Sequence, residues 1–407
     1  MRTGTYTVRA TLPDGRIFTC GGESAISDRD ASTGETASFA LAMGEGRDAL
    51  DIGAILPASI GGTLYVDGDE NGSMDANEAG LSGAVITLMQ GGTVVAACET
   101  DADGAYAFNT VRPGTYRVRM TLPEDTLFAT QTPLTLADAD ATEGETPAFA
   151  IGMGQQAQID ALGTVRAARI AGKAWTDENA DGRMERSEPA LPGTMVELLA
   201  FDSQGIVRVL SSVTVGEDGA YAFGMLRSGV YALRITLPEG MLFADSLGTE
   251  DSSAVPVVPG NVGMTAYMTL AMGEQRSSVH VGGIRPGAIG DTVWLDLDGN
   301  GLQDYREPLI PGVELTLWRV ERDGSTQEVA RTVSDAYGYY RFTDLRPGTY
   351  ALSVEQKEGC TLTYSFGAPL GEIDSDLEPE TGRSAEIVLG SGQALLNVDV
   401  GYTEYTK

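Results

Sequence analysis

The sequence has little basic charge and no long hydrophobic run. Its 407 residues include 58 aspartates and glutamates against 27 lysines and arginines, which gives a formal net charge of −31. Nucleic acids and anionic membrane surfaces attract basic patches, so we expect neither as a partner. A membrane-spanning helix needs about 20 consecutive apolar residues. Because no run approaches that length, we also expect no membrane insertion.

Cysteine is scarce as well. The three cysteines, Cys20, Cys98 and Cys360, lie far apart, and none has a neighbour at zinc-site spacing. We therefore expect no disulfide within a domain. This scarcity does not indicate the cytosol, because a bound metal can stabilise an extracellular domain in place of disulfides.

Histidine occurs once, at His280. The same strand position holds an aspartate, Asp51 or Asp399, in other repeats of the chain, so we interpret His280 as an exposed strand residue rather than a general base. No nucleophile and base occur together in the sequence. We therefore expect that the chain is not an enzyme.

What the sequence has instead is an acidic loop of twelve residues in three copies, at residues 67–78, 177–188 and 296–307. Oxygen-bearing side chains occupy positions 1, 3, 5, 9 and 12, and glycine occupies position 6, which is the ligand order of an EF-hand calcium loop. Position 7 contributes only its backbone carbonyl. The candidate ligands are Asp67, Asp69, Asn71, Ser73, Asp75 and Glu78 in the first loop, Asp177, Asn179, Asp181, Arg183, Glu185 and Glu188 in the second, and Asp296, Asp298, Asn300, Leu302, Asp304 and Glu307 in the third.

The residue types in these loops match the needs of calcium. The ion takes six to eight oxygens at about 2.3–2.6 Å, and the chain must turn sharply to wrap it, which Gly72, Gly182 and Gly301 permit. Glutamate recurs at position 12, where two carboxylate oxygens are needed at once. A single acidic turn could bind nothing, but three full matches at equivalent places predict Ca²⁺ as the bound ion.

The segments around the loops argue against a helical calcium sensor. Pro189 and Pro308 directly follow the last ligand in two copies, so no exit helix can form there. An aromatic residue, Tyr65, Trp175 or Trp294, lies two positions before the first ligand in a segment typical of a strand. Dockerins carry such loops in close tandem, whereas these begin 110 and 119 residues apart (177 − 67 and 296 − 177).

Other motifs recur with a similar period. Gly-x-Tyr at residues 4, 114, 229 and 348 opens an alternating strand each time, and a turn glycine followed by two aromatics precedes it in three copies. Short strands with turns between them predict an all-β fold, a tandem array of antiparallel β-sandwich domains (Ig-like or prealbumin-like) with about seven strands each. The predicted domains are residues 59–167, 168–287 and 288–407, preceded by residues 1–58.

Residues 1–58 match only the C-terminal half of a repeat. The missing front strands would leave sheet edges uncovered, so we expect poor stability unless something replaces them. Met1 is followed directly by Arg-Thr-Gly-Thr-Tyr without an apolar signal region, which predicts a fragment or a misassigned start. The joints between domains are short and of equal length, which predicts a stiff rod.

Taken together, these motifs resemble the B-type repeats of the serine-aspartate-repeat adhesins of staphylococci, the SdrD B-like domain of the prealbumin-like and Cna-B-like group. Residues 289–304 resemble the opening strand and calcium loop of that family, and residues 338–350 resemble its hairpin. The resemblance implies monomeric, calcium-stiffened stalk domains, extracellular on a bacterial cell wall or secreted. They would project a separate region that binds a host or neighbouring-cell protein or glycan.

The same resemblance implies further, weaker calcium sites. Asp374 and Asp376, followed by Thr381-Gly382, are at the place where the family has such acids. The counterparts elsewhere are Asp138 with Asp140 and Asp28 with Asp30, whereas the second repeat has Glu250 and Asp251 in a different setting.

Three alternatives to a plain stalk follow from the sequence. A binding module would need an exposed aromatic platform, but strand context makes Trp175, Trp294 and Trp318 core or loop-packing residues. An internal Lys–Asn isopeptide bond, as in the Cna-B group, would need a lysine on a first strand, where only Lys173 lies, and that repeat has no helper acid. Carbohydrate- or protein-binding or spacer modules of a secreted multidomain enzyme are the remaining alternative.

Overall fold

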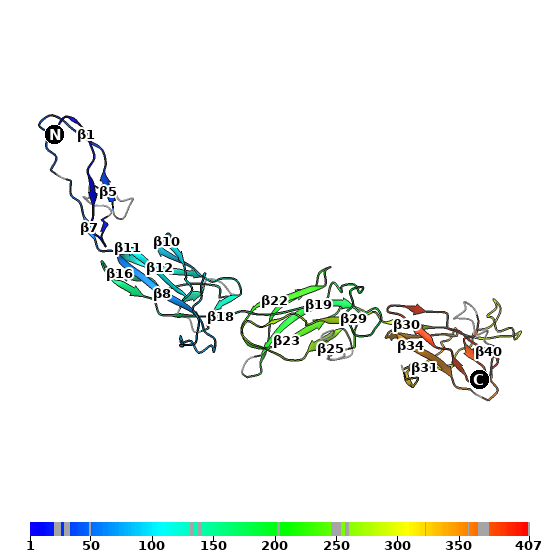
Figure 1. Cartoon of the computed structure of the whole chain (residues 1–407). Coiled ribbons are helices and arrows are strands. Elements are labelled where there is room, and N and C mark those ends of the chain that lie inside the picture. Colours follow the sequence, from blue (N-terminus) through cyan, green and yellow to red (C-terminus); the bar gives the residue numbers. More distant parts are fainter. Residues whose placement is uncertain are drawn as a thin grey trace. The chain divides into compact units, whose positions relative to one another are not determined.

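A computed structural model describes residues 1–19, 26, 27, 33–48, 50–130, 134–136, 141–201, 204–245, 254–256, 260–321, 323–356, 358–364 and 374–405. Every helix or strand element within these ranges is a β-strand (Figure 1), which confirms the all-β class. In the same ranges there is no helix with the length and apolar character needed to cross a bilayer.

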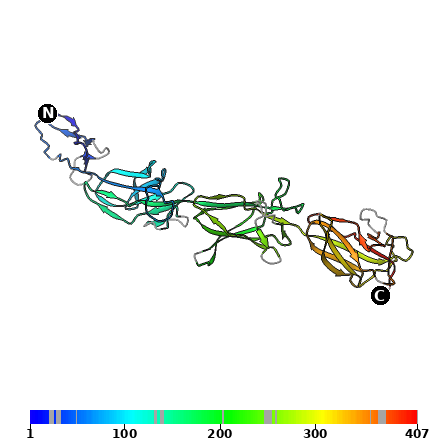
Figure 2. The ribbon, with the colours of Figure 1, turned by 60° about the horizontal axis from the view of Figure 1, so that its bottom comes forward.

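The chain forms two compact units. The first contains Met1–Ala168 with two short segments, Gly224–Ser228 and Ala271–Glu274, and the second contains the rest. Figure 2 shows from another direction that each complete repeat consists of two facing layers of strands.

The first unit contains one complete β-sandwich. Its six-stranded sheet has the order β10 (Thr93–Glu99), β9 (Val85–Gln90), β12 (Gly114–Thr121), β15 (Glu143–Glu145), β14 (Thr135–Leu136), with β16 (Phe149–Ile151) also paired to β12. Its five-stranded sheet has the order β11 (Ala105–Val111), β8 (Ala58–Val66), β18 (Leu162–Arg166), β13 (Thr126–Phe128), with β17 (Gln156–Gln158) also paired to β8.

The second unit contains two sandwiches with the same topology. In the second repeat the six-stranded sheet has the order β21 (Val207–Thr214), β20 (Met195–Phe201), β23 (Gly229–Thr236), β26 (Val262–Thr265), β25 (Ala254–Pro256), with β27 (Met268–Leu270) also paired to β23. Its five-stranded sheet has the order β22 (Ala220–Leu226), β19 (Ala168–Thr176), β29 (Val281–Ile284), β24 (Leu242–Phe243), with β28 (Gln275–Arg276) also paired to β19. In the third repeat the six-stranded sheet has the order β32 (Thr326–Val333), β31 (Glu314–Val320), β34 (Gly348–Val354), β37 (Arg383–Ser384), β36 (Leu377–Glu378), with β38 (Ile387–Leu389) also paired to β34. Its five-stranded sheet has the order β33 (Tyr339–Leu345), β30 (Gly287–Leu295), β40 (Val400–Glu404), β35 (Thr361–Leu362), with β39 (Ala394–Leu395) also paired to β30.

These sandwiches differ from the sequence prediction in two respects. Each has a six-stranded and a five-stranded sheet rather than about seven strands, because the back half of each repeat contains several pairings of only two or three residues. The last strand also lies parallel to the first: β18 pairs with β8, β29 with β19 and β40 with β30. Parallel neighbours need a long crossover connection, here the whole repeat between first and last strand.

The hairpin aromatics form part of each core, as the sequence predicts. Tyr106 and Phe108 in β11 are buried, and their ring centroids lie 6.4 Å apart in an edge-to-face arrangement. The corresponding pairs Tyr221–Phe223 and Tyr340–Phe342 have centroid distances of 6.3 and 6.1 Å. This geometry is favourable for aromatic pairs and adds to the free energy gained from burial.

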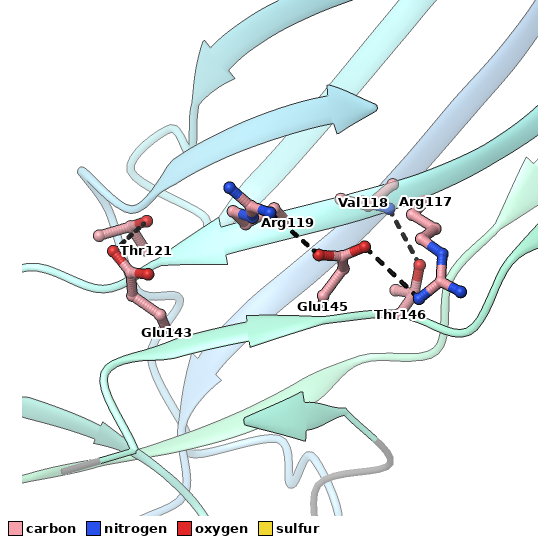
Figure 3. A network of polar contacts seen from close by, with 7 residues as sticks. All are labelled: Arg117, Val118, Arg119, Thr121, Glu143, Glu145 and Thr146. Carbon is pink, nitrogen blue, oxygen red and sulfur yellow. Dashed lines mark hydrogen bonds and ion pairs between the residues drawn. The ribbon is translucent and has the colours of Figure 1, made fainter. Parts of the chain in front are cut away.

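Polar contacts fix the register of β12 against β15 (Figure 3). The Val118 amide donates to Thr146 Oγ1 at 2.9 Å, so a side chain replaces a ladder hydrogen bond at the point where β12 passes from β16 to β15. Beside it, Glu145 is paired with Arg119 at 3.2 Å and with Arg117 at 3.5 Å. Opposite charges directly across a strand pair stabilise it modestly.

The described strands of residues 1–58 form three small sheets. In the first, β1 (Gly4–Tyr6) pairs with β6 (Phe39–Leu41). In the second, β5 (Thr33–Thr36) lies between β2 (Arg9–Thr11) and β4 (Ile26–Ser27) and pairs with both. In the third, β3 (Ile17–Phe18) pairs with β7 (Ala54–Ile55). These pairings are those of the back half of a complete repeat, in which β12 pairs with β16 and β15 and β13 pairs with β18.

Candidate metal centres

Each acidic loop begins where the first strand of its repeat ends. The amide of the first loop residue donates to a carbonyl of the last strand: Asp67 to Thr164, Asp177 to Gly283 and Asp296 to Tyr402, each at 2.8 Å. At the other end of the loop an isolated bridge returns the chain to the aromatic residue of the first strand, pairing Tyr65 with Gly80, Trp175 with Ala190 and Trp294 with Leu309. Both ends of every loop are therefore held by the sandwich.

The aspartate at position 1 is the most enclosed residue of each loop. Asp67 and Asp177 are 0% exposed and Asp296 is 1% exposed. In the first loop the amides of Asn71 and Gly72 donate to the two Asp67 carboxylate oxygens at 3.1 and 2.9 Å. Equivalent contacts of 2.8 to 3.2 Å occur in the second and third loops. These bonds turn the loop around the buried carboxylate.

The glutamate at position 12 closes each loop. The Glu78 carboxylate accepts from the amides of Gly68 and Asp75 at 2.6 and 2.9 Å, which are positions 2 and 9. Glu188 and Glu307 make the same two contacts in their loops. Both carboxylate oxygens are thus held at the loop interior, where a bidentate ligand is required.

The side chains at positions 3, 5 and 9 converge on the same space. The Asn71 side-chain amide donates to Asp69 at 2.8 Å and to Asp75 at 3.1 Å, and Asn300 bridges Asp298 and Asp304 at 3.2 and 3.1 Å. One carboxylate oxygen from each of three residues falls within a 4.8 Å cluster in the first loop (Asp67, Asp69, Glu78) and in the third (Asp296, Asp298, Glu307). The second loop has Asn179 at position 3, so its acids are Asp177, Asp181, Glu185 and Glu188.

In the part of the chain that the structure describes, the negative charge of the loop carboxylates is not compensated by basic side chains. Among the residues that the structure describes, no lysine or arginine pairs with a loop carboxylate. Burial and the neighbouring Glu185 carboxylate together raise the pKa of Glu188 to about 7. Burial likewise raises the pKa of Asp177. Four acids held together in this way favour a divalent cation among them.

The third loop has an additional donor. The Thr363 hydroxyl donates to Asp296 Oδ2. Burial alone would raise the pKa of Asp296, but this hydroxyl and the loop amides of Gly301, Gly299 and Asn300 together leave the pKa below its ordinary value. The carboxylate is therefore held ready in its charged form.

The donor set fits calcium. It consists of carboxylates, side-chain amide oxygens and one backbone carbonyl, with no imidazole or thiolate, and hard cations prefer such ligands. The sharp turn predicted at position 6 is present, since Gly72, Gly182 and Gly301 have φ of 79°, 76° and 80°. Position 4 also lies in the left-handed region, at Glu70, Ala180 and Gly299, which the sequence analysis did not single out.

A second acidic group lies beside the loop of the third repeat. Asp374 forms an isolated bridge with Leu302, position 7 of the loop. The Asp399 amide donates to Asp376 Oδ2 at 2.8 Å, and the Thr292 hydroxyl donates to Asp399 Oδ1 at 2.7 Å. Asp399 and Asp291 were missed as members of this group by the sequence analysis, because only the pairing of β30 with β40 brings them near Asp374 and Asp376.

The acids at the other expected weaker sites are not among the described residues. Asp28, Asp30, Asp138, Asp140, Glu250 and Asp251 lie outside the described residues, and so does Cys20. Within the described residues, neither Cys98 nor Cys360 takes part in a disulfide.

The three tryptophans are buried or half-buried, so they form no exposed aromatic platform. Trp175 and Trp294 are buried behind the loops, and the half-buried Trp318 donates from its indole to Ser353 Oγ at 2.7 Å. This confirms their interpretation as packing residues. His280 lies between β28 and β29 and is half-buried rather than an exposed strand residue, and its Nδ1 accepts from the Lys173 amide at 3.1 Å.

Comparison with known proteins places these features in a family. The SdrD B-like domain model matches residues 58–163, 168–283 and 287–402. Serine-aspartate repeat-containing protein D of Staphylococcus aureus (strain Newman) is 29% identical over 343 residues, covering 83% of this chain and 25% of that protein. Serine-aspartate repeat-containing protein F of Staphylococcus epidermidis is 26% identical over 391 residues, covering 93% of this chain and 22% of that protein. The chain thus spans about a quarter of the length of these relatives.

Two solved structures are also similar to the chain. BcpA, the major pilin subunit of Bacillus cereus, has 14% sequence identity and a TM-score of 0.32, and the match covers 84% of this chain and 99% of that chain. The Bacillus anthracis TIE protein has 13% sequence identity and a TM-score of 0.27, and the match covers 99% of this chain and 60% of that chain. The family model matches most of the sequence in three successive copies, and each copy contains one acidic loop at the end of its first strand. The chain therefore belongs to the SdrD B-like domain family.

Proposed function

We propose that this chain is a calcium-stabilised stalk of a bacterial cell-surface adhesin. Its tandem domains would act as a structural spacer for a ligand-binding region outside the chain. The observation that supports this most is the convergence of the carboxylates at positions 1, 3 and 12 within 4.8 Å in the first and third loops, at strand ends fixed by the sandwich.

Each loop would hold one Ca²⁺ through its candidate ligands at positions 1, 3, 5, 7, 9 and 12. Without the ion, the four carboxylates of a loop repel one another and the buried position-1 aspartate lacks a countercharge. With the ion at about 100 times its Kd, the native state gains roughly 2.7 kcal/mol per site. That is a large share of the free energy of unfolding of a single domain.

The relatives support a location outside the cell. The similar proteins of Staphylococcus aureus and Staphylococcus epidermidis are serine-aspartate repeat-containing proteins. We assign this chain to the outside of a bacterial cell, where calcium loops with Kd values of about 10⁻⁴–10⁻³ M are filled. A host or neighbouring-cell protein or glycan would be bound by other parts of the full protein.

Thermal unfolding with and without calcium tests the proposal. We expect excess calcium to raise Tm by roughly 10 °C over the same protein in excess chelator. Magnesium at the same concentration should raise Tm much less, because it demands a smaller octahedral site. Equal melting curves in calcium and chelator would contradict the proposed role.

A further inference from the structure

The third repeat has a surface pocket of about 480 Å³ where the edge strands of its two sheets, β32 and β33, meet. This volume lies in the range of about 300–1,000 Å³ that is usual for small-ligand pockets. The side chains that matter for its chemistry are Asp291 from β30, Val333 from β32, Tyr339, Tyr340 and Arg341 from β33, and Leu396 after β39. None of the candidate ligands of the calcium loop lines this pocket.

The other two complete repeats have the same strands, so the pocket can be compared position by position. Tyr340 lies opposite Asp291 in the third repeat, and its counterpart Tyr106 lies opposite Gly62 in the first. At the positions of Asp291, Tyr339 and Arg341 the first repeat has Gly62, Ala105 and Ala107, and the second has Gly172, Ala220 and Ala222. The three repeats thus share the backbone and the central tyrosine, and the third alone adds a carboxylate, an aromatic ring and a guanidinium.

The apolar side chains of the pocket are also particular to the third repeat. Tyr339 is 53% exposed, Val333 is 52% exposed and Leu396 is 46% exposed. At the positions of Val333 and Leu396 the strand register places polar residues in the other repeats, Glu99 and Gln158 in the first and Thr214 and Ser277 in the second. Exposed apolar side chains that gather around one pocket, at positions that are otherwise polar, indicate surface that a ligand covers.

The polar side chains of the pocket have hydrogen-bonding capacity left for a ligand. Among the residues that the structure describes, neither the Asp291 carboxylate nor the Arg341 guanidinium has a hydrogen bond or an ion pair. Asp335, which also lines the pocket, accepts the amides of Tyr337 and Tyr339 through Oδ1 at 2.8 and 3.0 Å. A ligand that fills the pocket must therefore offer donors to carboxylates and an acceptor to a guanidinium.

We propose that this pocket binds a neutral saccharide. Sugar hydroxyls both donate and accept, so vicinal hydroxyls can serve Asp291 and Arg341 together. The C–H face of a pyranose ring carries partial positive charge, which the negative face of the Tyr339 ring attracts. Two carboxylates against one guanidinium disfavour an anionic ligand, and a proline-rich segment lacks the N–H donors that the carboxylates need. Tyr339 and Arg341 belong to neither the calcium loop nor the acidic group around Asp399, so this site is distinct from both.

Saturation-transfer NMR on the full chain in excess calcium tests this inference. The probes are the methyl glycosides of glucose, galactose, mannose and N-acetylglucosamine, each at tens of millimolar. We expect transfer from the protein to the ring C–H protons of at least one glycoside. Tyr339→Ala and Arg341→Ala should each weaken that binding by roughly five-fold. Both variants should fold, because the other two repeats have alanine at these positions, and an unchanged Tm in calcium checks this.

The control variant is Tyr305→Ala, which removes a fully exposed tyrosine of the same repeat that does not line the pocket, and it should leave glycoside binding unchanged. Methyl glucuronide and a proline decapeptide are the competing probes. Tighter binding of either one than of every neutral glycoside would overturn the saccharide assignment in favour of an anion or a peptide. Transfer to none of the glycosides, or glycoside binding that Tyr339→Ala and Arg341→Ala leave unchanged, would overturn the site itself.

Discussion

Asp376 and Asp399 face each other across the third repeat, with the Asp399 amide donating to Asp376 Oδ2 at 2.8 Å and the Asp376 amide donating to the Asp399 carbonyl at 3.0 Å. Burial, together with the charges of neighbouring aspartates, raises the pKa of Asp376 to about 7 and that of Asp399 to about 6. At these two carboxyls the folded third repeat therefore binds protons more tightly than the unfolded chain does.

The pH dependence of stability follows from this sign. Raised carboxyl pKa values make the free energy of unfolding fall as pH rises from about 4, the unfolded value, to about 7. In chelator, we expect the third repeat to resist urea better at pH 5 than at pH 8. The Trp175→Phe variant leaves only Trp294 and Trp318, both in the third repeat, as fluorescence probes. Greater stability at pH 8 in chelator would contradict the prediction.

Glu307→Gln tests the bidentate ligand of the third loop. The change keeps the shape of the side chain but removes the charge, so we expect calcium to stabilise the third repeat by about 2 kcal/mol less than in the parent. Glu386→Gln removes one charge from an exposed position of the same repeat and is the matched control. Calcium-dependent urea unfolding measures both, and equal calcium effects in the two variants would argue against Glu307 as a ligand.

Position 4 of the loops offers a test of backbone conformation. Ala180 has φ of 53°, a region that costs a residue with Cβ about 1–2 kcal/mol, whereas the third loop has Gly299 there at φ 73°. Against this gain, glycine raises the conformational entropy of the unfolded chain, which lowers the free energy of unfolding by about 0.4–1 kcal/mol. We therefore expect Ala180→Gly to stabilise the second repeat by roughly 0.5 kcal/mol, measured by denaturant unfolding in excess calcium.

The reverse change serves as the control for that prediction. A Cβ on Gly299 would meet no atom within 4 Å, so Gly299→Ala changes the backbone preference alone. It should destabilise the third repeat by a similar amount. Stabilisation by both changes would refute the conformational explanation.

Thr146 tests the side chain that replaces a ladder hydrogen bond. Thr146→Val is nearly isosteric but leaves the buried Val118 amide without an acceptor, which costs about 1–3 kcal/mol. Thr146→Ser should retain most of the stability, because Ser384 makes the same contact to the Leu352 amide in the third repeat at 2.9 Å. Urea unfolding of the two variants gives the comparison, and equal losses would point to packing rather than the hydrogen bond.

The features predicted well from the sequence are those coded by neighbouring residues. The twelve-residue spacing places all candidate ligands of one loop in a single segment, so the proximity of Asp67 and Glu78 could be predicted without any knowledge of the fold. The alternating pattern of Tyr106 and Phe108 likewise identifies one buried face of one strand.

The features that were missed depend on pairing between distant segments. Asp291 and Asp399 meet only because the last strand returns parallel to the first, and no local signal predicts that register. The half-buried position of His280 has the same origin, since the Lys173 amide on the first strand donates to it. The extra short strands were missed because two- or three-residue pairings have no periodicity to detect.

Equilibrium calcium binding to the whole chain tests the central claim most directly. The account predicts at least three saturable sites per chain, with one site lost in each of the single variants Glu78→Gln, Glu188→Gln and Glu307→Gln and none lost in Glu386→Gln. A chain that binds no calcium saturably at millimolar concentration, or that keeps all its sites in the three loop variants, would contradict the account.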